Sequence, residues 1–147
     1  MGMYFDDFSI GQEFISPART VTEYDVMVFA GLSGDYNPLH TDVEFCKQTQ
    51  WGKPLAHGML GLSIATGLTS RMGLFDGTAI AFAGLSWSFT GPIFFGDTIH
   101  LRMVVKEKRE TSKKDRGALI RDIELINQRG EVVQKGEFSL MMKRRPE

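Results

Sequence analysis

The sequence predicts an α+β fold in which an antiparallel β-sheet packs around one long buried helix. Residues 57–71 are apolar around most of a helical circumference, which is typical of a helix that other elements enclose. Residues 98–105 alternate between two kinds of side chain, which is the period of a strand with two different faces. The other strong strand patterns also follow the helix, so the sheet is expected in the second half of the chain.

The first elements of the chain are expected to be a short strand and a capped helix. The strand is predicted over residues 14–20. Thr22 is suited to cap a helix, because Glu23 and Asp25 then place acidic groups in the first turn. Glycines at the far end predict that this helix stops within residues 31–34.

A long polar segment separates this helix from the buried one. Residues 35–54 contain two prolines, and a short helix over residues 42–48 is compatible with their pattern. Such a long irregular stretch in a small domain is usually functional. We therefore expect the chemistry of the protein here.

Strands make up the remainder of the chain. Besides residues 98–105, we expect strands over residues 79–89, 118–127 and 132–143. The last two are joined by residues 127–130, a short loop that ends in a glycine and is typical of a hairpin. Neighbouring strands should therefore be antiparallel.

Length and composition exclude several classes of protein. The chain has 147 residues with 42% hydrophobic and 24% charged side chains, which predicts a single domain over residues 1–147. A net charge of -1 gives no overall attraction for nucleic acid or an anionic membrane. The apolar runs are too short to span a bilayer. A single cysteine, Cys46, and an acidic N-terminal segment favour the cytoplasm over secretion.

The densest group of reactive side chains lies in residues 34–40 and 56–60. An Asn-Pro pair between Asp35 and His40 favours a bend that can aim both side chains at one point. A carboxylate and an imidazole that share one water make an acid/base pair at neutral pH. Spacing alone leaves a second interpretation open, in which Asp35 caps a turn and His40 is a loop residue bonded to backbone.

Three motifs carry a resemblance to a known family. They are S-G-D-x-N-P-x-H at residues 33–40, K-P-x-A-H-G-M-L at residues 53–60 and G-P-x-x-x-G-D at residues 91–97. The first two resemble the hydratase 2 motif of the MaoC-like dehydratases, the family of (R)-specific enoyl-CoA hydratases, and the third extends the likeness along the chain. The resemblance implies the hot dog fold, in which an antiparallel sheet wraps around one long helix.

The resemblance also implies an activity and a set of site residues. The activity is reversible syn hydration of a trans-2-enoyl thioester to an (R)-3-hydroxyacyl thioester in fatty acid metabolism, with Asp35 and His40 as the acid/base dyad. Gly58, at the predicted helix start, corresponds to the family's backbone oxyanion donor, although close packing alone also explains a glycine there. The supporting positions are Asn37, His57 and Ser63, of which a lone helix serine is otherwise a back-bonded residue.

Two alternative functions and several partner predictions complete the sequence interpretation. A hot dog thioesterase would direct water to the carbonyl carbon, and a non-catalytic subunit would only bind acyl thioesters. We expect water and a coenzyme A or acyl carrier protein thioester as substrates, with no metal, no redox cofactor and no nucleic acid. Open sheet edges predict a homodimer or a dimer of dimers.

Overall fold

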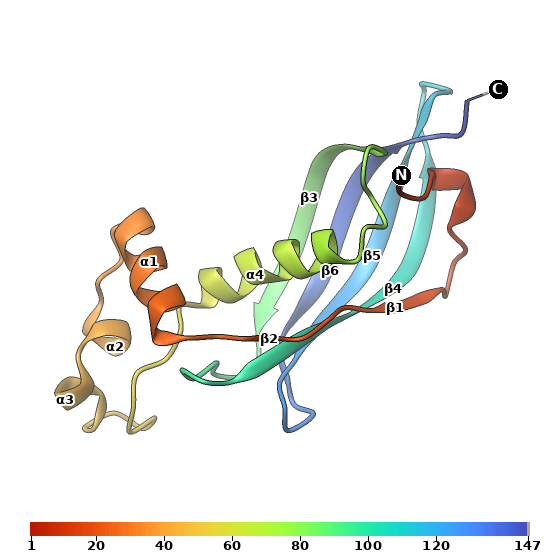
Figure 1. The fold of residues 1–147 in the computed structure, drawn as a ribbon. Coiled ribbons are helices and arrows are strands. Elements are labelled where there is room, and N and C mark those ends of the chain that lie inside the picture. Colours follow the sequence, from red (N-terminus) through yellow and green to blue (C-terminus); the bar gives the residue numbers. More distant parts are fainter. Residues whose placement is uncertain (147) are drawn as a thin grey trace.

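The computed structural model describes residues 1–146, in which a sheet curves around a central helix (Figure 1). The sheet has six antiparallel strands in the order β1-β4-β5-β6-β3, and β2 pairs with β4 outside this path. The expected α+β class and hot dog architecture are confirmed. The strands are β1 Glu13–Ile15, β2 Arg19–Thr20, β3 Ala79–Phe89, β4 Thr98–Glu110, β5 Arg116–Ile126 and β6 Val132–Lys143.

The central helix is α4, Gly58–Arg71, which lies across the inner face of the sheet (Figure 1). The helix is central, as expected, but other elements do not enclose it on every side. Met59 is 56% exposed, and Ser63, Thr66 and Ser70 are exposed as well. The sheet covers only one side of α4, and the open side carries hydroxyl groups that water can solvate. The buried side consists of Leu60, Gly61, Leu62, Ile64, Ala65, Leu68 and Thr69.

The second half of the chain follows its alternating pattern closely. Over residues 98–105 of β4, every second side chain is buried, and these are the apolar residues Ile99, Leu101, Met103 and Val105. The turn between β5 and β6 has Gly130 at φ +77°, a conformation that glycine adopts without strain. The predicted strand and the predicted hairpin are therefore both confirmed.

The strand predicted over residues 14–20 is instead two short strands, β1 and β2, which both pair with β4. Pro17 lies between them, and its missing N–H interrupts the ladder. The hydroxyl of Ser16 accepts a hydrogen bond from the N–H of Leu101 at 2.8 Å. This contact keeps the interrupted segment against β4.

Helix α1, Glu23–Ser33, begins and ends where its sequence signals predict. The N–H of Asp25 donates to the Thr22 hydroxyl at 3.2 Å, and the N–H of Thr22 donates to the Asp25 carboxylate at 2.9 Å. This reciprocal pair is a capping box. Gly34 ends the helix at φ +78°, the left-handed conformation that favours glycine.

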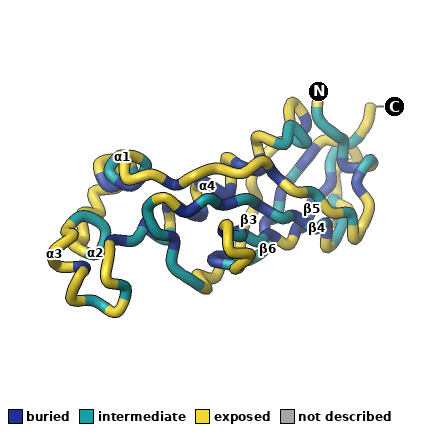
Figure 2. The backbone as a smooth tube through the Cα atoms, turned by 60° about the horizontal axis from the view of Figure 1, so that its bottom comes forward, coloured by how far each residue is buried: buried dark blue, intermediate teal, exposed yellow. Residues whose placement is uncertain are grey.

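Two short helices follow, α2 Pro38–Thr41 and α3 Val43–Cys46. Helix α3 lies within the predicted residues 42–48, whereas α2 was not predicted. Asn37 starts α2, because its side-chain oxygen accepts the N–H of Leu39 at 3.0 Å. Figure 2 shows that this end of the molecule is mostly exposed, while buried residues follow α4 and the sheet. None of the helices within residues 1–146 is long and apolar enough to cross a membrane.

Strand β3 forms an open edge of the sheet. Within residues 1–146 it pairs only with β6, and its side chains are mostly exposed. Its large apolar side chains include Ile80, Phe82, Leu85 and Phe89, each between 38% and 54% exposed. An exposed apolar edge of this kind is a template for pairing with another chain.

A buried carboxylate holds the turn that leads into β4. The Asp97 side chain accepts the N–H of Phe94 at 2.9 Å and the side-chain amide of Gln128 at 2.8 Å, and Arg129 lies 3.4 Å away. Burial opposes ionisation of this carboxyl, but the hydrogen bonds and the arginine outweigh it and hold the pKa below its usual value. Asp97 therefore stabilises the fold in its charged form.

We expect Asp97→Asn to lower the free energy of unfolding at pH 7 by about 1 to 3 kcal/mol, because charge-assisted hydrogen bonds are lost. The pKa of Asp97 is lower in the folded than in the unfolded chain. Asp97 thus contributes fully to the free energy of unfolding when the pH is above its pKa in the unfolded chain, about 3.9. This contribution is lost as the pH falls through the pKa of Asp97 in the folded chain. Urea unfolding of both proteins from pH 7 to pH 3 measures this.

The matched control is Asp122→Asn, whose carboxylate is 54% exposed and 3.9 Å from Lys106. An exposed pair of this kind contributes little, so this variant should unfold almost like the parent. A deficit in Asp97→Asn that stays constant down to pH 3 would contradict the assigned role of the charge.

Candidate active site

The loop after α1 presents Asp35 beside the start of α2. Gly34 turns the chain out of α1, and the Asp35 side chain then accepts the N–H of Asn37 at 3.2 Å. This turn fixes the carboxylate locally while Asp35 stays exposed. The carboxylate is therefore held in place but can still contact water or a ligand.

His40 lies in α2, half-buried, with one ring nitrogen already engaged. Its Nδ1 is 2.7 Å from the carbonyl oxygen of Leu55. Because a carbonyl oxygen only accepts, Nδ1 carries the proton of this hydrogen bond. The other nitrogen, Nε2, is then free to accept or deliver a proton.

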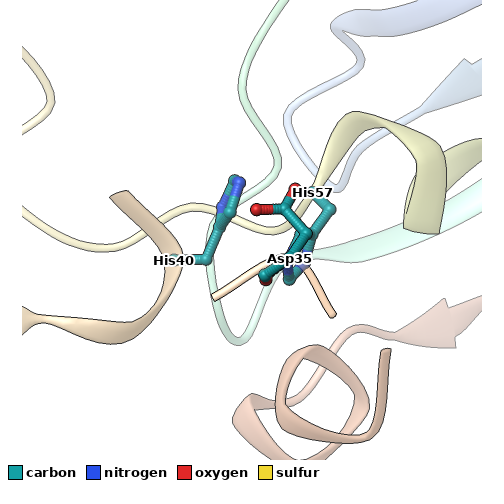
Figure 3. Close-up of side chains that lie close together, drawn as sticks. All are labelled: Asp35, His40 and His57. Carbon is teal, nitrogen blue, oxygen red and sulfur yellow. The ribbon is translucent and has the colours of Figure 1, made fainter. Parts of the chain in front are cut away.

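His57 is buried beneath these two residues and joins them (Figure 3). Its Nε2 donates to the backbone carbonyl of Asp35 at 2.9 Å, and its ring stacks on the His40 ring with centroids 3.8 Å apart. Phe29 of α1 packs against its other side, at 4.9 Å between centroids. His57 thus positions both members of the predicted dyad.

Gly58 begins α4 directly after His57, with its N–H at the positive end of the helix dipole. Within residues 1–146 this N–H has no hydrogen-bond acceptor. A Cβ atom at this position would lie 2.8 Å from the Phe89 ring, so only glycine fits without moving that ring. The sequence left two explanations for this glycine, a free N–H donor and close packing. The structure has both the free Gly58 N–H and the close packing against Phe89.

A pocket of about 410 Å³ lies beside part of this site. His40 and Gly58 both line it, whereas Asp35 lies outside its walls. Most of its surface is apolar, which suits an apolar ligand group. The other lining residues are Leu39, Trp51, Leu55, Ala56, Phe89, Thr90, Gly91, Pro92, Ile93 and Gln134.

Asn37 and Ser63 have different places in the structure. Asn37 caps α2 with its side chain, and its backbone N–H donates to the Asp35 carboxylate. The hydroxyl of Ser63 donates to the carbonyl of Met59 at 2.8 Å, and the residue is exposed on the open side of α4. The structure therefore brings Asn37 to the dyad and gives Ser63 the back-bonded role of an ordinary helix serine.

Gln134 is a site residue that sequence reasoning missed. It is buried, donates to the carbonyl of Gly58 at 3.1 Å and accepts from the indole of Trp87 at 3.0 Å. It therefore holds the first turn of α4 in position from the neighbouring strand β6. A glutamine in a strand pattern carries no signal for this inward position, because polar strand residues usually face solvent.

The three side chains Asp35, His40 and His57 also fulfil the distance requirement of a metal site, since one donor atom from each lies within 4.8 Å of the others. Their orientation is poor for chelation. One nitrogen of each histidine is already bonded to a backbone carbonyl, and the two rings are only 29° from parallel. Lone pairs of stacked rings do not converge on one ion, as tetrahedral coordination requires.

The fold and site together define a hot dog domain of the hydratase/dehydratase class. The sequence profile of the MaoC like domain matches residues 7–123, and the chain belongs to the MaoC-like dehydratase family. It is 35% identical to the (R)-specific enoyl-CoA hydratase of Rhodospirillum rubrum over 103 residues. The aligned segment covers 69% of each protein. The resemblance that the three motifs carry is confirmed at the level of the family.

Solved structures agree with this assignment. A monoamine oxidase regulatory protein from Archaeoglobus has a TM-score of 0.92 and 41% identity, over 99% of this chain and 97% of that one. The MaoC-like dehydratase of Rhodospirillum rubrum has a TM-score of 0.88 and 30% identity, over 99% of this chain and all of that one. The similarity in fold therefore extends over nearly the whole chain.

Proposed function

We propose that the protein interconverts trans-2-enoyl and (R)-3-hydroxyacyl thioesters by syn addition and removal of water. The observation that carries this proposal is the grouping of Asp35, His40 and His57. One donor atom from each lies within 4.8 Å of the others, and the His57 ring stacks on the His40 ring. A free backbone N–H at Gly58 lies on the same pocket as His40. A water held by the dyad and a thioester oxygen held by Gly58 provide the two contacts that hydration needs.

The proton balance of the reaction fits these groups. The water oxygen forms a bond to the β-carbon while the dyad removes one proton from the water. The electron pair of the double bond moves toward the thioester carbonyl and forms an enolate, which the Gly58 N–H stabilises. The dyad then returns the proton to the α-carbon on the same face, which gives syn addition. Dehydration follows the same steps in reverse.

A panel of trans-2-enoyl thioesters tests the proposal. A hydratase lowers the absorbance of the conjugated thioester without releasing free thiol. A thioesterase releases thiol, and a subunit that only binds acyl groups does neither, so either result would overturn the proposal. Comparison of coenzyme A with acyl carrier protein thioesters of different chain lengths defines the substrate.

We expect hydration to proceed without a metal ion. Asp35 and His40 activate water through proton transfer, and the stacked histidine rings disfavour chelation. Exhaustive chelation should therefore leave the hydration rate unchanged. Loss of activity that a divalent ion restores would instead assign the water activation to a metal.

We also propose that two copies pair through β3 to form a two-fold dimer. This strand has an unpaired edge and exposed apolar side chains. Exposed Thr66 and Ser70 of α4 line one pocket together with Phe82 of this strand. Closed two-fold symmetry covers such an edge in both copies. Light scattering at micromolar concentration should give twice the chain mass or a multiple of that dimer. Leu85→Lys should shift the measured mass toward that of a single chain. A parent protein with the mass of a single chain would contradict the pairing.

A further inference from the structure

Gln134 of β6 is a buried amide whose two ends contact different elements. Only 2% of the residue is exposed. Its Nε2 donates to the backbone carbonyl of Gly58 at 3.1 Å, and its Oε1 accepts the indole N–H of Trp87 at 3.0 Å. Trp87 belongs to β3, which is the neighbour of β6 in the sheet (Figure 1). The amide therefore joins the start of α4 to two strands.

The two hydrogen-bond partners determine which way this amide points. An indole N–H only donates, and a backbone carbonyl only accepts. A flipped amide would place two donors together at Trp87 and two acceptors together at Gly58. The indole N–H of Trp87 therefore keeps the Nε2 group of Gln134 directed at the carbonyl of Gly58. A side chain without a donor at position 134 does not form this bond.

Two glycines provide the space that this arrangement needs. A Cβ atom at Gly61, three positions after Gly58, would overlap the side-chain amide of Gln134. A Cβ atom at Gly136, which lies opposite Trp87 in the register of β3 and β6, would be 2.7 Å from the Trp87 ring. That ring also stacks on Phe138, with centroids 5.2 Å apart. The close packing leaves the amide little freedom to change its orientation.

Gln134 holds the same residue that offers a free donor to the site. It lines the pocket of about 410 Å³ together with Gly58 and His40. Its hydrogen bond is to the carbonyl of Gly58, whose own N–H has no acceptor within residues 1–146. Because glycine has the widest range of backbone conformations, an external hydrogen bond is needed to restrict it. Displacement of a catalytic group by about 1 Å can cost on the order of 10²-fold in rate.

We propose that Gln134 is a positioning residue for hydration, which holds the Gly58 N–H where charge develops on the thioester oxygen. This inference rests on the proposed hydratase function. Gln134 transfers no proton in it. Its amide keeps the first turn of α4 at a fixed place against β6, and Trp87 keeps the amide in the orientation that donates to Gly58. A donor fixed in this way stabilises the enolate without reorganising during the reaction.

Gln134→Glu tests this role through pH. The two side chains have nearly the same shape, but an ionised carboxylate has no proton to donate and repels the carbonyl of Gly58, whereas the protonated acid donates again. Burial raises the pKa of a carboxyl group at this position above its ordinary value of about 4.3. We expect the ratio of variant to parental kcat to fall about 10-fold or more between pH 5 and pH 9. His40 is the one titratable side chain that lines this pocket with Gln134, and the ratio to the parent removes its effect.

Three further variants separate the hydrogen bond from general packing. Gln134→Met has no donor at any pH, so its kcat should be lower by a factor that does not vary with pH, while KM changes less. Trp87→Phe keeps a ring on Phe138 but removes the N–H that orients the amide, and should lower kcat by about 3- to 10-fold, the equivalent of one neutral hydrogen bond. The matched control is Lys135→Met at the adjacent, exposed position of β6, which should keep the parental kcat.

The Gly58 amide resonance in a ¹H–¹⁵N NMR spectrum gives a readout that needs no substrate. Relative to the parent, it should shift with pH in Gln134→Glu, with the same midpoint as the kcat ratio, and stay in place in Lys135→Met. A parent protein that does not hydrate enoyl thioesters would refute the proposed function, and this resonance would still test whether Gln134 holds Gly58.

Several results would overturn the positioning role while leaving the hydratase function intact. They are parental kcat in the folded Gln134→Met protein, a kcat ratio for Gln134→Glu that does not vary with pH, and a Gly58 resonance at its parental position in both variants. Circular dichroism checks that each variant is folded. Should neither Gln134 variant fold, parental kcat in Trp87→Phe would overturn the proposal.

Discussion

Replacement of Asp35 by asparagine, or of His40 by glutamine, lowers turnover of enoyl thioesters by an expected 10²-fold or more, which is about the usual scale of acid/base catalysis. The new asparagine keeps a side-chain oxygen for the N–H of Asn37 but no longer accepts a proton. The new glutamine stays polar but does not titrate. Substrate binding should change less than turnover, because the lost interaction belongs to the transition state. Steady-state kinetics of both variants measures kcat and KM separately.

The double variant distinguishes a dyad from two independent groups. If both side chains act on one water, the combined loss should be much smaller than the product of the single losses. The matched control is Asp42→Asn in the same loop. Its carboxylate caps α3 through the N–H of Phe45, and asparagine caps equally well, so this variant should keep its activity. Folded single variants with parental turnover would show that the loop is structural.

Local signals account for the parts of the fold that could be predicted. The capping box joins Thr22 and Asp25 over three positions, and the hairpin turn needs only the four residues that end at Gly130. The alternation in β4 is a property of the strand itself. In each case the interacting groups are close in sequence, so the pattern contains the structural information.

The detailed geometry of the site depends on contacts between distant residues. His57 reaches the carbonyl of Asp35 across 22 positions, and His40 reaches that of Leu55 across 15. The family motif placed all three side chains in one site, but it did not indicate that His57 stacks beneath His40. This contact depends on how α2 and the segment before α4 fold against each other. Helix α2 is only four residues long, too short for a periodic signal.

Arg121 shows a different limit of sequence patterns. The strand that contains it was predicted, but an arginine in a strand is normally expected to face solvent. A register shift in β4 between Val105 and Glu107 lies opposite Ile120 and Arg121, and both of these side chains are buried. Such an irregularity breaks the period of two, so alternation no longer tells which face a side chain occupies.

The proposed oxyanion contact of the Gly58 N–H can be tested without changing any side-chain acid or base. Gly58→Pro removes the backbone N–H while proline suits the first position of a helix. The preceding residue, His57, has φ -58° and ψ +139°, which proline at the next position tolerates. We expect kcat to fall by about 10²- to 10³-fold, equivalent to about 3 to 4 kcal/mol of transition-state stabilisation.

Gly58→Ala is the matched control for this change, because it adds a Cβ atom beside Phe89 but keeps the N–H. Phe89 is 54% exposed and its ring can move, so this variant should fold and change KM more than kcat. Circular dichroism and unfolding midpoints check that both variants keep α4. A large loss of kcat in Gly58→Pro with a small one in Gly58→Ala identifies the N–H as the donor. Equal kcat values in the two folded variants would instead assign Gly58 a packing role only, because the Cβ atom is common to both and the N–H is not.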